Sequence, residues 1–241
     1  MTSRATRIRC RTVLLLVTYV CLLLTPLRGV AAGAADIAGI WLPDGARSQR
    51  FPAEPPLTAQ GRRIVTEWRA SHDPIEDDPG KFCQSPGMPS VALSGAGYPT
   101  EIIVTPEQVT ILMEAHQQVR RVFIDAAHPE RPFPQRNGHS VGHWENDTLV
   151  VDTMAIKAIT FGAVPHSDQM HVVERLRATD DGNTLVNEIT ITDPLMYSEP
   201  IVVQRYFTSA PAGTQMLEYE CTEGMWIEHE ESRGRDALAG D

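Results

Sequence analysis

The sequence predicts an all-β domain in which an antiparallel meander closes into a barrel, with one short helix before it. Two observations support this class. From residue 101 onward, apolar and polar residues alternate in about nine short runs, a pattern typical of strands that bury one face. These runs are joined by turn residues such as Asn146 and Asp147. No helix-length segment lies between them, and parallel strands usually need such a segment as a crossover, so we expect antiparallel pairing. A two-sheet sandwich is the alternative arrangement.

The expected strands follow one another at hairpin spacing after a first apolar run at residues 37–42. They comprise residues 101–105, 109–116, 119–125, 140–145, 148–153, 171–178, 184–192, 201–208 and 216–221.

The segment before the meander contains the expected helix, at residues 58–71. Thr58 is a suitable N-cap, and Ile64, Val65 and Trp68 recur on one face of the turns that follow. A loop rich in Pro, Gly, Asp and Ser then covers residues 72–100. Loops of this length are uncommon inside compact domains, so we expect this one to be anchored.

The composition limits the partners that the chain can have. It holds 31 acidic and 21 basic residues, a net charge of -10, and 42% of its 241 residues are hydrophobic. Nucleic acids and anionic membrane surfaces select for Lys and Arg, so the balance argues against both as the main partner. Beyond the N-terminus no run of 18 apolar residues is present, so no stable membrane span is expected.

The N-terminus has the features of a signal peptide at residues 1–35. Four arginines precede residue 12, residues 13–24 are apolar apart from Thr18, and residues 30–35 are small. The apolar stretch of about 12 residues is short for a membrane anchor. The sequence therefore predicts a periplasmic or secreted protein with one barrel domain at residues 36–227 and a charged, flexible tail at residues 228–241.

Two cysteines remain after the signal peptide, Cys83 and Cys221. An even pair in an oxidising compartment predicts a disulfide between them, which would anchor the long loop. A catalytic thiol is the alternative, but no helix start favours it.

Two short patterns resemble known families. Gly39, Ile40 and Trp41 resemble the G-x-W motif that opens lipocalin-like barrels, where Gly permits close backbone approach and Trp closes the floor. Residues 138–153, GHSVGHWENDTLVVDT, resemble the signature of a large uncharacterised family of secreted bacterial proteins, in which Arg is more usual at the position of His143. The resemblance implies a secreted all-β domain and supplies no activity.

Charged residues that interrupt apolar strand faces are the first candidates for a site. Glu174 alternates with Val172 and Leu176, and both Arg205 and Arg121 also share a face with apolar residues. A buried charge needs a partner, so Glu174 is expected to pair with Arg205 or Arg121. Such a pair is either purely structural or part of a small-molecule site.

Imidazole groups near strand ends are the second candidates. His139 follows Gly138 at a strand start, and His171 precedes Glu174 by three residues. Residues 171 and 174 lie on opposite faces of a regular strand, so either a bulge intervenes or only one of them is inside. Asp193 and Tyr197 flank a Pro turn at a barrel rim. The histidine spacings fit no compact metal site, so no metal and no organic cofactor are expected.

Two functions compete on this reasoning. In the first, the barrel cavity binds a small, largely apolar molecule and performs cofactor-independent acid–base chemistry of the lyase, hydratase or isomerase type. The catalytic residues would be His139, His171 and Glu174, and the substrate-binding residues Arg205, Tyr197, Asp193 and Arg121. In the second, the barrel is a non-catalytic, lipocalin-like carrier of a hydrophobic ligand. The oligomeric state is not predicted.

Export predicts cleavage between Ala31 and Asp36, because the small-residue tract lies there. N-terminal sequencing of the protein from the cell envelope should yield a chain that starts in this interval. A chain that still begins at Met1 or Thr2 would contradict the prediction.

Overall fold

The computed structural model describes residues 37–73, 77, 79–94, 97–160, 164–179 and 181–233. The predicted signal peptide lies outside these ranges, as does the tail beyond residue 233. Among the described helices, none combines the length and the hydropathy needed to cross a bilayer.

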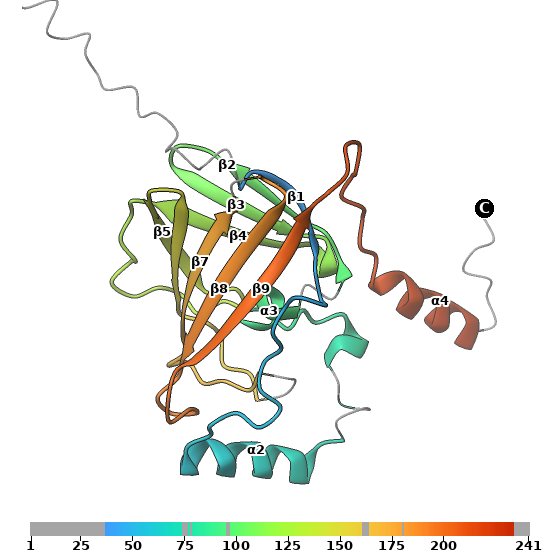
Figure 1. The fold of residues 1–241 in the computed structure, drawn as a ribbon. Coiled ribbons are helices and arrows are strands. Elements are labelled where there is room, and N and C mark those ends of the chain that lie inside the picture. The colour runs from blue at the N-terminus through green and yellow to red at the C-terminus, as the bar shows by residue number, and fades with distance from the viewer. Residues whose placement is uncertain are drawn as a thin grey trace, which may run out of the picture.

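Nine strands form one closed barrel, and the predicted fold class, an all-β barrel with a short helix before it, is confirmed (Figure 1). The strands are β1 Gly39–Pro43, β2 Thr100–Val104, β3 Gln108–Met113, β4 Gln118–Ile124, β5 His139–Glu145, β6 Thr148–Met154, β7 His171–Ala178, β8 Thr184–Thr192 and β9 Ile201–Ser209. The helices are α2 Ala59–Ser71, η1 Pro79–Phe82, α3 Ser90–Ser94, η3 Ala115–Gln117 and α4 Thr222–Ser232.

One contact in the barrel departs from the predicted antiparallel order. β4 and β5 pair in parallel, and only at Val122–Ser140, Phe123–Val141 and Ile124–Gly142. The expectation that parallel pairs need a helical crossover is wrong here. The Pro-rich segment between Asp125 and Gly138 is long enough to return the chain along the barrel without forming a helix.

The C-terminal part also differs from the prediction. Residues 216–221 form no strand, and β1 completes the nine-stranded barrel by pairing with β9 at Trp41–Ser209. α4 runs through Ser232, so the first residues of the expected flexible tail are helical. A strand at residues 216–221 would have no free sheet edge to join, because the barrel is already closed.

The start of β1 explains its Gly and Trp. Gly39 has a φ of 125°, a backbone conformation that residues other than glycine rarely adopt. A Cβ at this position would meet no atom within 4 Å. The glycine is therefore needed for its backbone conformation and not for close approach. Trp41 is buried, and its indole N–H donates to the carbonyl of Ile37 at 2.9 Å.

The helix predicted at residues 58–71 is confirmed, together with its cap. The side chain of Thr58 accepts from the backbone N–H of Gly61 at 2.9 Å, and Val65 is buried against the barrel. The same Thr58 hydroxyl donates to the carbonyl of Leu195, so the cap also fixes the helix to the β8–β9 connection.

The barrel interior contains two apolar clusters with a polar layer between them. On β7, Val172 belongs to one cluster and Leu176 to the other, and Glu174 lies between them. Asn187 and Arg205 occupy the corresponding positions on β8 and β9. We define the polar layer by its buried members Arg120, Ser140, Thr153, Glu174, Asn187 and Arg205.

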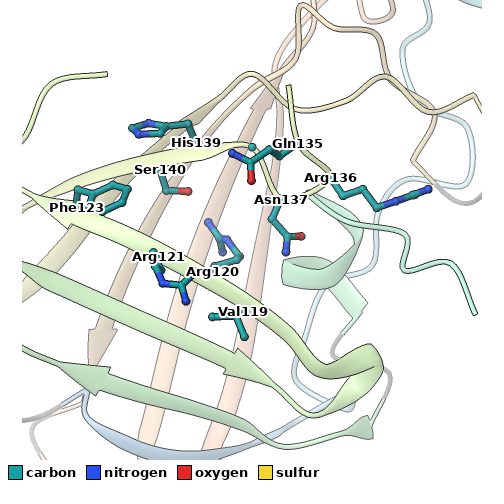
Figure 2. A pocket seen from close by; sticks show the side chains of 10 residues that line it. Val119, Arg120, Arg121, Phe123, Gln135, Arg136, Asn137, His139 and Ser140 are labelled. Atoms are coloured by element: carbon teal, nitrogen blue, oxygen red, sulfur yellow. The ribbon is translucent and has the colours of Figure 1, made fainter. Parts of the chain in front are cut away.

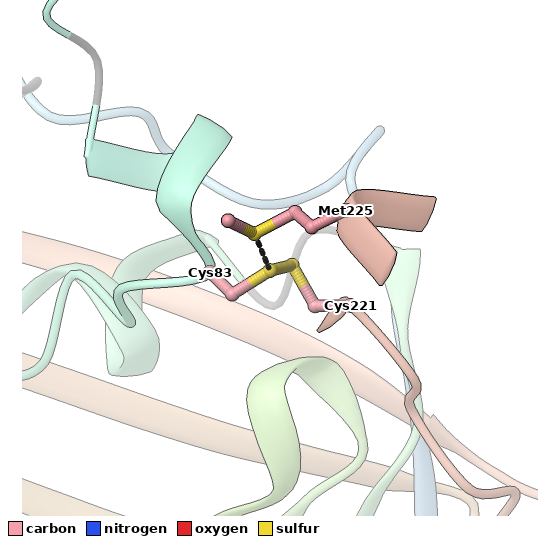
Figure 3. The surroundings of a disulfide bond; sticks show 3 residues. All are labelled: Cys83, Cys221 and Met225. Carbon is pink, nitrogen blue, oxygen red and sulfur yellow. Dashed lines mark hydrogen bonds between the residues drawn. A yellow bond between two sulfur atoms is a disulfide. The ribbon is translucent and has the colours of Figure 1, made fainter. Parts of the chain in front are cut away.

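The predicted disulfide joins Cys83, just after η1, to Cys221, just before α4, with Cα atoms 5.6 Å apart (Figure 3). The sulfur of Met225 on α4 lies 3.7 Å from the Cys83 sulfur. The bond links positions separated by 138 residues, and it ties the long loop before the meander to the segment after it.

Removing this link should lower stability, because a cross-link over so long a loop restricts the unfolded chain. Replacing both cysteines by Ala should reduce the free energy of unfolding by up to about 4 kcal/mol. Urea denaturation of both proteins, followed by circular dichroism, measures the difference. An unchanged unfolding midpoint would contradict this prediction, because it would show that the disulfide does not contribute to the stability of the barrel.

Candidate functional site

The polar layer is organised around a buried ion pair between Arg120 and Glu174. Arg120 is 3% exposed and Glu174 1% exposed. Nη1 of Arg120 donates to Oε1 of Glu174 at 3.3 Å, and Nη2 makes a second, closer contact with Oε2. Asn187 Nδ2 also donates to Oε1, at 2.9 Å. Glu174 is therefore inside the barrel as predicted, but its partner is neither Arg205 nor Arg121.

The misassigned partner comes from the register of β4. The sequence placed Val119, Arg121 and Phe123 on the inner face, whereas the structure exposes all three and turns Arg120 and Val122 inward. Both faces of β4 carry apolar side chains, so alternation alone does not select the buried one.

The interior beside the ion pair is nearly filled. The space lined by Arg120, Glu174 and Asn187 measures about 30 Å³, the volume of one water molecule. At the level of the ion pair the described interior therefore has room for little more than a water molecule, and the predicted ligand cavity of the barrel stays a prediction. The large apolar side chains around this space come from the second cluster, among them Met113, Leu185 and Phe207, and α3 adds Val91 and Ala92.

A larger pocket of about 430 Å³ opens through the barrel wall between β4 and the start of β5; we call it the wall pocket (Figure 2). Arg121, Phe123 and His139 lie on the outer face of the barrel around it. Arg120 and Ser140, both of the polar layer, form its inner part.

The short parallel contact creates this pocket. β4 and β5 are paired only from Val122 and Ser140 onward, so their earlier residues separate and leave the wall open. Asn137 bridges the gap, since its Nδ2 donates to Oε1 of Gln118 on β4 at 3.0 Å. The buried Arg120 of the polar layer thereby forms the inner end of the pocket.

Two glycines of the GHSVG segment fix the position of His139. Gly138 has φ of 66°, and a Cβ there would lie 2.6 Å from the carbonyl oxygen of Met154. A Cβ on Gly142 would lie 2.7 Å from Val122. These close approaches hold the start of β5 against β6 and β4, so the backbone of His139 has little freedom.

The same segment matches the G-x-S-x-G pattern of serine hydrolases, with Ser140 at the nucleophile position. Its context is different, because Ser140 lies near the start of a strand and not on a strand-to-helix turn. Its hydroxyl is buried and shares a hydrogen bond of 2.8 Å with Thr153. Ser140 is therefore part of the polar layer and lacks the geometry of a hydrolase nucleophile.

Three histidines and one aspartate form a hydrogen-bonded chain beside the pocket. Oδ1 of Asp152 lies 2.8 Å from Nε2 of His171 and 3.1 Å from Nε2 of His128. Nδ1 of His128 lies 2.8 Å from Nδ1 of His139. The chain thus runs from His171 through Asp152 and His128 to His139, which lines the pocket.

The order of the bonds allows an arrangement of protons in which Nε2 of His139 is an acceptor. An ionised carboxylate only accepts, so Asp152 accepts the Nε2 proton of His128. When His128 carries only this Nε2 proton, its Nδ1 accepts a hydrogen bond from Nδ1 of His139. This leaves Nε2 of His139 without a proton. Burial, and secondarily the nearby His128, lower the pKa of His139, which favours its neutral form.

His171 does not enter the barrel. β7 and β8 pair without interruption from His171–Thr192 to Ala178–Leu185, so no bulge intervenes and only Glu174 is inside. The predicted grouping of His139, His171 and Glu174 in one cavity is therefore wrong. His171 is linked to His139 through Asp152 and His128 on the outer surface, whereas Glu174 lies behind the wall.

Asp193 and Tyr197 are structural in their contacts. Both oxygens of Asp193 accept from Ser167, from its backbone N–H and its hydroxyl, each at 2.7 Å. The hydroxyl of buried Tyr197 donates to the carbonyl of Pro165, and burial raises its pKa. These bonds hold the β8–β9 corner, so the predicted substrate contacts of both residues lack support. Arg205 lines a different pocket.

Sequence reasoning missed Arg120, His128 and Asp152. Asp152 ends an apolar run and His128 lies in a Pro-rich segment, and neither carries a local signal of function. The one available signal was the alternation of Asp152 with buried Val151 and Thr153 in β6, which marks it as outward-facing. Among the described residues, no group of three side chains is arranged to hold a metal ion.

The fold and the pocket define this protein as a closed β-barrel with a basic opening through its wall. No family model matches the sequence, and no curated protein matches it. Among solved structures, apo lipid binding protein 8 (LBP-8) of Caenorhabditis elegans is similar, with a TM-score of 0.37 and 10% identity. The alignment covers 75% of this chain and all of that one.

The buried ion pair should dominate the stability of the barrel. Glu174→Gln leaves the Arg120 charge uncompensated in the interior, so unfolding free energy should fall by about 3–5 kcal/mol. The double variant Arg120→Met, Glu174→Leu removes both charges and should recover most of that loss. Urea denaturation provides the comparison.

Arg175→Gln is the matched control for this series. It breaks an exposed pair with Glu145 on the outer face of the same strand, and it should change stability by less than about 1 kcal/mol. Equal effects of Glu174→Gln and Arg175→Gln would contradict the assigned role of the buried pair.

Proposed function

We propose that the protein binds a small organic anion with an apolar body in the wall pocket, where His139 transfers a proton without a cofactor. The protein would act in the periplasm or outside the cell, which fits the disulfide. The observation that carries the proposal is the hydrogen-bonded chain from Asp152 through His128 to His139 at the pocket, in which Nε2 of His139 can act as a base.

The charge of the pocket favours an anion. Among its described lining residues, Arg120, Arg121 and Arg136 are basic and none is acidic, although the whole chain has a net charge of -10. Glu174 neutralises Arg120, but Arg136 donates to neutral acceptors, the carbonyl of Ser85 at 2.9 Å and Oε1 of Gln84 at 2.7 Å. Arg121 and Arg136 therefore supply positive charge for a carboxylate.

The aromatic side of the pocket favours an apolar body on that anion. Phe123 is 38% exposed, unusual for a large aromatic side chain, and its ring stacks on His139 with centroids 5.4 Å apart. A planar or aromatic group can continue this stack while the carboxylate reaches Arg121. The proposed ligand thus carries a charged group at one end, whereas the sequence predicted a largely apolar compound.

The supported chemistry is removal or addition of a proton next to a carboxylate or carbonyl, as in lyases and isomerases. His139 would accept the proton at Nε2, and Asp152 would stabilise the charged chain through His128. Arg121 would stabilise the negative charge that develops on the substrate. A carrier is the second candidate, in which the same pocket binds the anion without proton transfer.

Phenylpyruvate in D₂O distinguishes these candidates, because it is an aromatic anion with exchangeable C–H bonds next to a carbonyl. The protein should accelerate deuterium exchange at C3, measured by proton NMR, and His139→Gln should slow the exchange about 100-fold or more. The wild-type rate should fall as the pH drops through the His139 pKa, below the ordinary histidine value, because protonation removes the base.

His143→Gln is the matched control, since His143 lies on the outer face of the same strand and contacts Glu145, away from the pocket. This variant should exchange at the wild-type rate. Binding of phenylpyruvate that requires Arg121, with no exchange beyond the buffer rate, would support the carrier. Absence of binding to wild-type protein would contradict both candidates.

A further inference from the structure

Two residues that line the wall pocket carry buried polar atoms without hydrogen-bond partners. The residues are Asn137 and Arg120 (Figure 2). Oδ1 of Asn137, an acceptor, and the Nε–H group of Arg120, a donor, are both buried and pair with no group among the described residues. Unpaired buried polar atoms are rare in folded proteins, because each has lost its hydrogen bond to water without a replacement. They therefore mark a place where a ligand can complete the pairing.

Neighbouring groups determine which end of the Asn137 amide is unpaired. Nε2 of Gln118 donates to the carbonyl of His116 at 3.0 Å, so the other end of this amide, Oε1, is turned toward Asn137. An amide oxygen only accepts, so Asn137 must present Nδ2 to it, at 3.0 Å. Turning either amide over would bring two oxygens together. The unpaired atom of Asn137 is therefore its oxygen, which needs a donor.

We propose that the ligand of the wall pocket carries a hydroxyl group beside its carboxylate, as in a 2-hydroxy acid or the enol of a 2-keto acid. This inference rests on the proposed function and names the substrate class more closely. A carboxylate only accepts hydrogen bonds, so an anion without a donor leaves Oδ1 of Asn137 unpaired. A hydroxyl donates to Asn137 and still has lone pairs that the Nε–H group of Arg120 can use.

The proposed proton transfer explains why the hydroxyl lies beside the carboxylate. When the C3 proton of a 2-keto acid moves to the C2 oxygen, the keto form becomes an enol, and no atom is gained or lost. The ketone oxygen only accepts, whereas the enol O–H can donate to Asn137. Asn137 would thus favour the enol, the form that proton transfer at His139 produces.

Calorimetric titration of the full chain with three aromatic acids of similar size tests the need for a donor. 3-Phenyllactate carries a hydroxyl at C2, 2-fluoro-3-phenylpropanoate carries a fluorine that cannot donate, and 3-phenylpropanoate has only hydrogen there. 3-Phenyllactate should bind about ten-fold or more tightly than either of the others, because it alone supplies a donor for Asn137. This comparison uses the wild-type protein, so it does not depend on whether a variant folds.

Two amide variants locate the preference for the hydroxyl. Asn137→Leu removes the unpaired acceptor, so 3-phenyllactate and 3-phenylpropanoate should then bind within about two-fold of each other. Gln135 is the matched control, because it also lines the pocket but is exposed, so its amide is open to water. Gln135→Met should keep the wild-type preference.

The outcomes separate this inference from the proposed function. Equal affinities of the wild-type protein for all three acids would overturn the inference and leave the proposed function intact. A preference that survives Asn137→Leu, or that is lost with Gln135→Met, would also overturn it, because the hydroxyl would then bind elsewhere. If the wild-type protein bound none of the three acids, that result would contradict the proposed function itself, and the inference with it.

Discussion

The fold depends on satisfying one buried ion pair, Arg120 with Glu174. The two residues come from β4 and β7, which are not neighbours in the sheet, so the pair crosses the barrel interior. Neither charge can be buried alone without a penalty of several kcal/mol, so the two strands must present these residues at the same level. Asn187 and Thr153 supply further hydrogen bonds to the pair. The apolar clusters then pack on either side of this layer.

The orientation of Arg120 also determines the outer surface of β4. With Arg120 inward, Arg121 and Phe123 must face outward, beside the place where β4 and β5 separate. The candidate site is therefore not inside the barrel, where ligands of many barrels bind, but in a gap of the wall. β4 and β9, which carry Arg120 and Arg205 of the polar layer, lie on opposite sides of the barrel.

The histidine chain shows how distant segments combine into one arrangement. His128 comes from the loop between β4 and β5, whereas Asp152 and His171 come from the outer faces of β6 and β7. Only the parallel return of the chain brings His128 next to His139. The tight packing at Gly138 then fixes the backbone of His139 beside the pocket.

The sequence by itself determined strands β2 to β9, the helix with its Thr58 cap, and the pairing of Cys83 with Cys221. Alternation and capping are local signals, and two remaining cysteines allow only one pairing. The strand expected at residues 216–221 does not form, because closure of the barrel through β1 leaves it no edge. The sequence also placed Glu174 inside, since both its neighbours on that face are apolar. Only the tertiary structure decided the partner of Glu174 and the parallel β4–β5 contact. Arg120 and Arg121 are adjacent in a strand with two apolar faces, and which one is buried depends on a carboxylate 54 positions away.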